Sequence, residues 1–474
     1  MSVFSYPFFI LWAITSICYY TFAKRWQWQI LLLASVVFYA VSIDRFPAVL
    51  LCVWFISYIA CLLISQYQSK IRLLILLASI CICITALCLG RVTSIVALLG
   101  NSYFVLKAAG CIVDAYREKG TEKNILRYLL YLIYWPGVLE GPFNRVQEFR
   151  NQLENRIEFD YVAFTHGILR FVWGAFKKLF IAERLELMVT AIMEKPEGKG
   201  GLYIMIGVVA YAIQIYADFS GFMDMMLGLS SSFGIKLPEN FKQPYFSRSI
   251  PEFWRRWHIT LGLWFRDYVM FPFTSNTIIK RISKTLRKKN KSIGKLLPLI
   301  AGTCIVWFFT GLWHGFSKNY LIWALYYAVL ICCSQIYNEF AKGQRNVKNG
   351  FYDSLRILRT ICLVLIADTF ICVQGMSNIR ILWKELLFNF TGGTSSVLSA
   401  NGLVIKDYIC IAIGCLLMLV VSLLKERGIG VQDKLDKTPI VIRWGIYYLL
   451  IYAILLFGLY GSQYDASQFL YMQF

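Results

Sequence analysis

The sequence predicts an all-α polytopic membrane protein, and two observations carry this prediction. Of the 474 residues, 58% are hydrophobic and only 16% are charged, with a mean hydropathy of +0.58. So few charges could not cover the surface of a soluble chain of this length. In addition, several apolar runs reach the roughly 20 residues that a helix needs to cross a bilayer core. We expect about 10–12 transmembrane crossings.

The apolar runs define the candidate spans in order. They cover residues 4–23, 27–43, 46–65, 72–90, 93–115, 202–234, 297–316, 319–338, 358–376, 406–424 and 443–461. The first run has no basic segment before it and no small-residue cleavage site, so we expect a permanent helix rather than a signal peptide. The run over 202–234 is long enough to cross twice or to hold a broken helix.

Lysine and arginine gather in alternate loops, which predicts the orientation. The densest cluster is "KRISKTLRKKNKSIGK", residues 280–295. Because basic loops stay in the cytosol, this pattern predicts that both termini lie outside the cytoplasm. The net charge of +21 then indicates contact with anionic lipids. The alternative is docking of an acidic carrier or of a phosphate-bearing donor such as coenzyme A. No nucleic-acid module is visible.

The segment over 134–185 differs from the uniform spans. "YWPGVLEGPFNR" has two prolines and two glycines, which break a helix. Broken backbone at membrane depth occurs only where it is buried in protein or lines a cavity. Two later stretches, "FTHGILRFVWGAFKKLFIAERL" and "SIPEFWRRWHITLGLWFRDYVMFPF", mix aromatic residues with arginine and favour interfacial helices. The 14 cysteines lie in or beside apolar segments and lack zinc-site spacing, so no metal site is predicted.

Three groups of polar side chains lie in apolar surroundings, where polar residues are costly and point to function. They are Asp218, Ser220 and Asp224 in "YADFSGFMD"; Arg255, His258 and Asp267 in "PEFWRRWHITLGLWFRDY"; and Trp313 with His314 in "GLWHG". The two aspartates are six residues apart, so they cannot share one face of a straight helix closely, although a kink at Ser220-Gly221 could change that. A histidine titrates near neutral pH and can act as a general base.

Each group also has a structural interpretation, which spacing alone leaves open. The aspartates could form a buried polar cluster that holds helices together, and the tryptophans beside His258 could form an interfacial belt. His314 could be a packing residue, and His166 is interpreted as one. The sequence lacks the motifs of soluble hydrolases, nucleotide triphosphatases and zinc proteases.

Together, "YWPGVLEGPFNR", "YADFSGFMDMMLGL", "LPENFKQPYFSRSIPEFWRRWHITLGLWFRDYVMFPF", "GLWHG" and the terminal "QFLYMQF" resemble the membrane-bound O-acyltransferase (MBOAT) family, in its bacterial alginate O-acetylation branch. The likeness runs from about residue 100 onward. It implies a ring of transmembrane helices around a central tunnel, with broken and interfacial helices. The whole chain, 1–474, would be one membrane-embedded domain. It would contain N-terminal helices (1–95), a catalytic core (96–345) and C-terminal helices with an outer tail (346–474).

The resemblance also implies roles for particular residues. His314 matches the active-site histidine and His258 the second histidine, both facing the tunnel. Asp218, Ser220, Asp224 and Asn240 match the same signature without a settled role. Tyr471 in "FLYMQF" matches a terminal tyrosine that would receive the acyl group before an extracytoplasmic transferase does; the alternative is a hydrophobic anchor.

This likeness leads to a functional expectation. An acyl group, best acetyl, would pass from a cytosolic thioester, acetyl-CoA or an acyl carrier, to an extracytoplasmic polysaccharide or to cell-wall peptidoglycan. No bound cofactor is expected, and an extracytoplasmic acyltransferase would be the partner. The sequence departs from the family at "FSGFMDMMLG", "FSKNY" and "LYYA", which affects the acceptor side.

Three alternatives accompany this expectation. The first is D-alanyl transfer to teichoic acid from a carrier protein, although that branch more often reads "FWNRWH". A secondary transporter would also use broken helices and intramembrane aspartate, but matching interrupted segments in two halves are missing from the sequence. A non-catalytic scaffold fits least, because it does not need a buried histidine.

Overall fold

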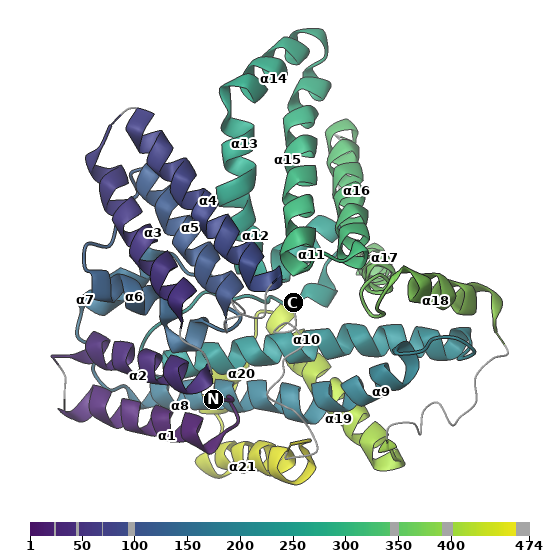
Figure 1. Ribbon diagram of the computed structural model, residues 1–474. Helices are drawn as coiled ribbons and strands as arrows, with labels where there is room; N and C mark the ends of the chain where they lie inside the picture. Colours follow the sequence, from purple (N-terminus) through teal and green to yellow (C-terminus); the bar gives the residue numbers. More distant parts are fainter. Residues whose placement is uncertain are drawn as a thin grey trace. The chain divides into compact units, whose positions relative to one another are not determined.

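The computed structural model describes residues 1–22, 25–43, 47–68, 70–92, 100–341, 350–390 and 402–460. Within these ranges the regular structure is entirely helical and contains no strand (Figure 1). The prediction of an all-α polytopic protein is therefore confirmed. The described residues form two compact units, the first from within 1–174 with 222–239 and the second from within 175–221 with 240–460.

The first unit holds the N-terminal helices. They are α1 (Tyr6–Ile17), the π-helix η1 (Cys18–Phe22), α2 (Gln27–Ser42), α3 (Ala48–Gln66), α4 (Lys70–Val92), α5 (Asn101–Tyr116), α6 (Ile125–Ile133), the 3-10 turn η2 (Trp135–Gly137), α7 (Val146–Glu154) and α8 (Tyr161–Ala175). The stretch "YWPGVLEGPFN", 134–144, is buried along its length. Its interruption of the helices, with a 3-10 turn and a cis Gly141–Pro142 bond, agrees with the predicted broken, protein-covered backbone.

The second unit holds the remaining elements. They are the π-helix η3 (Phe176–Ala182), α9 (Glu183–Met193), most of α10 (Gly201–Ser231), the 3-10 turn η4 (Pro244–Phe246), α11 (Ile250–Arg256), α12 (Ile259–Phe265), the π-helix η5 (Arg266–Met270), α13 (Phe271–Ser275), α14 (Thr277–Lys289), α15 (Lys291–His314), α16 (Lys318–Phe340), α17 (Gly350–Asp368), α18 (Met376–Phe388), α19 (Ile405–Glu426), α20 (Val431–Asp436) and α21 (Ile440–Phe457).

Seven helices in the described ranges are long and apolar enough to cross a membrane: α3, α4, α10, α15, α16, α19 and α21. Their number shows a multi-pass membrane protein. The other predicted spans correspond to shorter or more charged helices, namely α1 with η1, α2, α5 and α17. The outward side chains of α19 and α21 are mostly apolar and exposed, such as Leu416 and Leu449, as expected of helices that face lipid.

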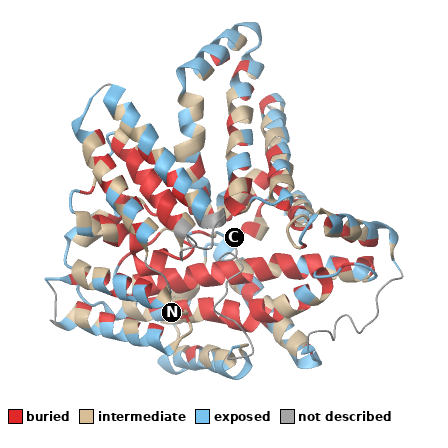
Figure 2. Cartoon of the chain, viewed as in Figure 1, coloured by how far each residue is buried: buried red, intermediate tan, exposed pale blue. Residues whose placement is uncertain are grey.

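One expectation about the long apolar run is wrong. Residues 202–234 neither cross twice nor contain a break, because α10 is one continuous helix over Gly201–Ser231. Figure 2 shows this helix buried along most of its length. Phe219 and Phe222, on either side of Ser220 and Gly221, are fully buried. A glycine inside a helix costs only about 1 kcal/mol, and burial of two phenylalanines exceeds that cost.

Candidate active site

His258 occupies a sharp turn between two short helices of the second unit. The hydroxyl of Ser249 accepts a hydrogen bond from the backbone N–H of Glu252 and so caps the start of α11. That helix ends at Arg256, and α12 begins at Ile259. His258 joins them with φ +45°, a left-handed conformation that few residues other than glycine adopt. The backbone is therefore strained at His258, as is common at functional sites.

The side chain of Asn240 fixes this turn. Its Oδ1 accepts hydrogen bonds from the backbone N–H of Thr260, at 3.0 Å, and from the Thr260 hydroxyl, at 2.7 Å. The same Oδ1 lies 3.5 Å from Nδ1 of His258. Because an amide oxygen only accepts, this contact places the imidazole proton on Nδ1. Nε2 then carries the lone pair of the neutral ring.

The surroundings of His258 are buried and mostly aromatic. Its side chain is 3% exposed, and the edges of Phe219 and Trp313 contact it at centroid distances of 4.8 and 6.0 Å. Burial lowers the pKa of His258 well below its usual value, and the nearby His314 lowers it further. Removing a charged imidazole from water is unfavourable, so His258 is neutral at physiological pH.

His314 ends α15 and lies on the same tryptophan. Its ring contacts Trp313 at 4.8 Å, stacks near-parallel to Tyr320 at 5.9 Å and meets the edge of Trp323 at 5.1 Å. The side chain is 5% exposed. Trp313 therefore contacts both histidines, and the structure brings together the two residues that the sequence placed 56 positions apart (314 − 258).

The glycines of "GLWHG" let α16 approach this site closely. A Cβ on Gly311 would lie 2.8 Å from Ala324, and one on Gly315 would lie 2.8 Å from the ring of Tyr320. Any side chain at these positions would push α16 and its aromatic residues away. The two glycines therefore permit close approach of the protein's own backbone and rings.

Tryptophans next to the histidines pack inward rather than forming a belt. Trp254 of α11 contacts Trp307, Trp323 and Tyr327 at 4.8 to 5.7 Å, and Trp257 is buried against Phe253. This aromatic cluster joins α11 to α15 and α16. Trp323 connects the cluster to the ring of His314.

Asp218 and Ser220 belong to a buried ionic cluster on α10 and η3. Lys178 lies 2.8 Å from Asp218 and 2.7 Å from Glu183, and Lys177 donates a 2.8 Å hydrogen bond to Ser220. Burial by itself lowers the pKa of Lys178, but the two carboxylates outweigh burial and raise it overall. The cluster thus keeps its charges and ties the π-helix to α10. For Asp218, this agrees with the interpretation of a buried polar cluster that holds helices together.

Asp224 has different partners in the first unit. Arg170 lies 2.8 Å from Asp224 and makes two 2.7 Å hydrogen bonds to Glu239. The expectation that Asp218 and Asp224 cannot share one face is confirmed. In a continuous helix, six residues turn the side chain by about 600°, or 120° short of two full turns.

The remaining candidates lie apart from the histidines. Arg255 is on the exposed side of α11, and Asp267 pairs with exposed Arg266 in η5 at 2.9 Å. Tyr471 lies outside the described residues. Among the described residues, no group of three or more His, Cys, Asp or Glu side chains could hold a metal ion.

Sequence reasoning missed the residues that position the histidines. Thr260, Tyr320 and Trp323 each carry a contact described above, and Lys177 and Lys178 complete the ionic cluster. The two lysines were detectable, because adjacent charges in an apolar segment need nearby partners. The aromatic contacts could not be predicted, because no single aromatic residue stands out in a chain with 14 tryptophans and 35 phenylalanines.

The fold and the site define a multi-pass membrane protein with two buried, neighbouring histidines. Residues 60–345, more than half of the chain, match the model of MBOAT, the membrane-bound O-acyltransferase family. The chain belongs to this family.

Curated relatives from three kinds of bacteria are similar to the chain. The protein named probable alginate O-acetylase AlgI of Pseudomonas syringae pv. tomato is 33% identical over 278 residues, 58% of this chain and 48% of the relative. A teichoic acid D-alanyltransferase of Bacillus subtilis is 30% identical over 286 residues, covering 59% and 68%. A peptidoglycan O-acetyltransferase of Helicobacter pylori is 26% identical over 268 residues, covering 51% and 48%. The chain spans about half the length of the alginate relatives that it matches.

Proposed function

We propose that this protein is an O-acyltransferase that moves an acetyl group from a cytosolic thioester to a hydroxyl of an extracytoplasmic polysaccharide or cell-wall polymer. The observation that supports the proposal most is the pair of buried histidines on Trp313. Family membership and the names of the relatives give the reaction class. The membrane is the bacterial cytoplasmic membrane, with both termini outside.

In this reaction the acceptor hydroxyl attacks the thioester carbonyl. His314 takes the hydroxyl proton as the general base, and the tetrahedral intermediate collapses by breaking the carbon–sulfur bond. The proton then passes to the departing sulfur, so the products are an oxygen ester and a thiol. Neutral His258, held by Asn240, positions the donor through the lone pair on Nε2.

The test is acyl transfer by the purified protein in proteoliposomes supplied with acetyl-CoA. General base catalysis contributes roughly 10²–10⁴-fold, so His314→Ala should insert and elute like the wild type while turnover falls by about that factor. His166→Ala is the matched control, because it also removes a histidine. Wild-type turnover by His314→Ala would refute the proposed role.

Tyr471 is proposed as the acyl relay to an extracytoplasmic transferase partner. Intact mass spectrometry of the C-terminal peptide should show an acetyl adduct on the wild type and none on Tyr471→Phe. A Tyr471→Phe strain with normal surface acylation would return the tail to the anchoring interpretation.

A second candidate is D-alanyl transfer from a carrier protein to teichoic acid. The 30% identity to the Bacillus subtilis relative, of which the chain covers 68%, favours it. "PEFWRRWH" and the terminal tyrosine motif favour acetyl transfer. Offering acetyl-CoA and a D-alanyl carrier thioester to the same proteoliposomes separates the two functions, since the adduct masses differ.

A further inference from the structure

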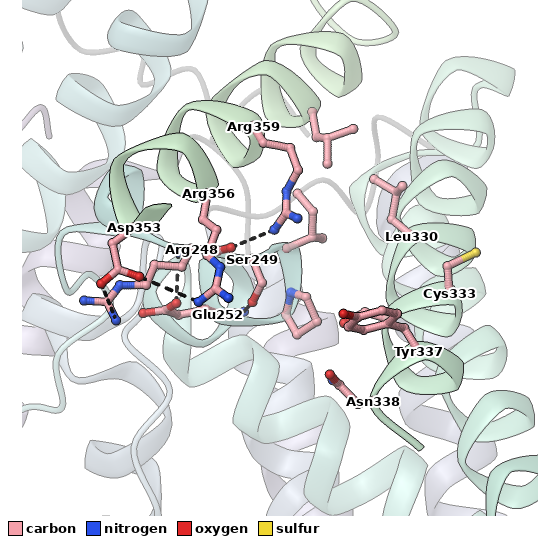
Figure 3. Close-up of a pocket in the computed structure, with 14 residues that line it drawn as sticks. Arg248, Ser249, Glu252, Leu330, Cys333, Tyr337, Asn338, Asp353, Arg356 and Arg359 are labelled. Atoms are coloured by element: carbon pink, nitrogen blue, oxygen red, sulfur yellow. Dashed lines mark hydrogen bonds and ion pairs between the residues drawn. The ribbon is translucent and has the colours of Figure 1, made fainter. Parts of the chain in front are cut away.

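The second unit contains a cavity that the proposed reaction does not use. It has a volume of about 880 Å³ and lies where the start of α11 meets α16 and α17. Figure 3 shows its two walls, with arginines on one side and the side chains of α16 on the other. Cavities of several hundred Å³ are the usual size of small-molecule sites. We call it the arginine pocket.

Three arginines give the pocket its charge: Arg248, Arg356 and Arg359. Two carboxylates, Glu252 and Asp353, also line it, so the positive groups exceed the negative ones by one. An arginine guanidinium carries five donors in a planar fork that suits phosphate oxygens. The pocket is therefore suited to an anion.

Glu252 is held by donors of the protein itself. One oxygen of its carboxylate pairs with Arg256 at 2.8 Å, and the other accepts from the backbone N–H of Arg248 at 2.9 Å. Arg256 in turn pairs with Glu426 at 2.7 Å. Both oxygens of this carboxylate therefore have donors within the protein, which weakens its repulsion of an anion in the cavity.

Asp353 is shared by two of the pocket arginines. Its two oxygens lie 3.3 Å from Arg248 and 3.7 Å from Arg356. Arg359 has no carboxylate partner within the described ranges, and its Nη2 donates only to the backbone carbonyl of Arg248, at 2.9 Å. Arg359 therefore retains most of its donors for a ligand.

The opposite wall is mostly apolar and faces outward, although Ser334 and Asn338 also line it. It includes Leu330, Cys333 and Tyr337 of α16, and Tyr337 is 63% exposed. α16 is one of the candidate spans, and only 22% of the residues in its most apolar stretch are buried. The mouth thus opens onto the surface where acyl chains of a bilayer would lie.

The geometry points to a site for the phosphate of an anionic phospholipid, held by Arg359 and its neighbouring arginines, with the lipid chains on α16. A soluble phosphate would leave the apolar wall exposed to water, whereas a lipid covers both walls. The pocket lies at the end of α16 that the Lys/Arg bias places on the cytosolic side. This inference concerns lipid binding and does not depend on acyl transfer.

The experiment is native mass spectrometry of the full chain in detergent, with phosphatidylglycerol or phosphatidylcholine carrying the same acyl chains. We expect one phosphatidylglycerol to bind at least about tenfold more tightly than phosphatidylcholine. Arg359→Gln should weaken that binding about tenfold, because charge-assisted hydrogen bonds to phosphate are lost. Arg380→Gln is the matched control, since it removes an exposed arginine of α18 outside the pocket and should bind like the wild type.

A second variant tests the apolar wall without changing any charge. Cys333→Trp places a large side chain on the exposed apolar wall and should also exclude the lipid. Equal binding of both lipids, or wild-type binding by Arg359→Gln, would overturn the assignment. Displacement of phosphatidylglycerol by coenzyme A would overturn it too, because the pocket would then belong to the phosphates of the thioester donor.

Discussion

Asn240 Oδ1 lies 3.5 Å from His258 Nδ1 while it accepts two shorter hydrogen bonds from Thr260. One amide oxygen thus sets both the backbone turn after His258 and the position of its ring proton. The contact with the imidazole is the longest of the three. The oxygen orients the ring while the burial described above keeps it neutral.

The stability of the protein should depend on this histidine below neutral pH. In the unfolded chain His258 has a pKa near 6.5, and burial lowers its pKa in the folded protein. The unfolded state therefore binds more protons between these two values. The free energy of unfolding should fall as the pH drops below about 6.5, by up to about 1.4 kcal/mol per pH unit.

His258→Asn is the variant for this measurement, because asparagine tolerates a positive φ and does not titrate. Melting temperatures in detergent would be compared between about pH 7.5 and pH 5.5, on either side of the unfolded pKa. The wild type should lose about 1–3 °C more than the variant over this range, because about 1.4 kcal/mol is small against the unfolding entropy of a chain of this length. Parallel curves would show that His258 is not a source of the acid sensitivity.

Replacing Asn240 by aspartate should move the pH dependence of turnover. In Asn240→Asp the new carboxylate would keep an acceptor for Thr260 and add a negative charge beside the ring. A nearby negative charge favours the imidazolium and raises the pKa of His258. If neutral His258 is required, the acid limb of the pH–rate profile should move to higher pH, while activity at alkaline pH stays within a few-fold. An unshifted profile would show that the protonation of His258 does not limit the reaction.

The positions of the spans and of the two histidines could be predicted from the sequence better than the contacts that hold the histidines in place. Hydropathy located the spans, and the "RRWH" and "WHG" motifs located both histidines. The partners of the histidines could not be predicted, because Asn240 contacts His258 across 18 residues through a turn that only the tertiary structure requires. The continuity of α10 could not be predicted for a related reason: Ser220 and Gly221 weaken a helix locally, while burial of the flanking phenylalanines in the tertiary structure keeps it continuous.

The buried ionic cluster should contribute to stability more than to chemistry. Lys178→Met would leave Asp218 and Glu183 without their shared cation, and removing one partner of a buried pair costs roughly 3–5 kcal/mol. Asp218→Asn would leave Lys178 paired with Glu183 and should cost less. Thermal unfolding should therefore rank the two variants in that order.

Activity per folded molecule separates the two roles of Asp218. Asp218→Asn should retain turnover within a few-fold of the wild type once it is corrected for the folded fraction. A loss of roughly 10²-fold or more, the range of a lost catalytic group, in properly folded Asp218→Asn would instead make Asp218 a direct participant in the reaction.

Gly315→Ala tests whether the close approach of α16 shapes the site. The new methyl group would lie 2.8 Å from the Tyr320 ring, which stacks on His314. Either the ring or the end of α15 must shift, and overpacking of this kind costs roughly 1–3 kcal/mol. Because the displaced ring touches His314, turnover per folded molecule should fall, and not only the fraction of folded protein.

Gly445→Ala is the matched control, since a Cβ there meets nothing within 4 Å and alanine favours a helix interior. We expect Gly445→Ala to keep wild-type turnover and to melt at the same or a higher temperature. Equal turnover of the two variants would show that the packing of Tyr320 against His314 has no part in positioning the base.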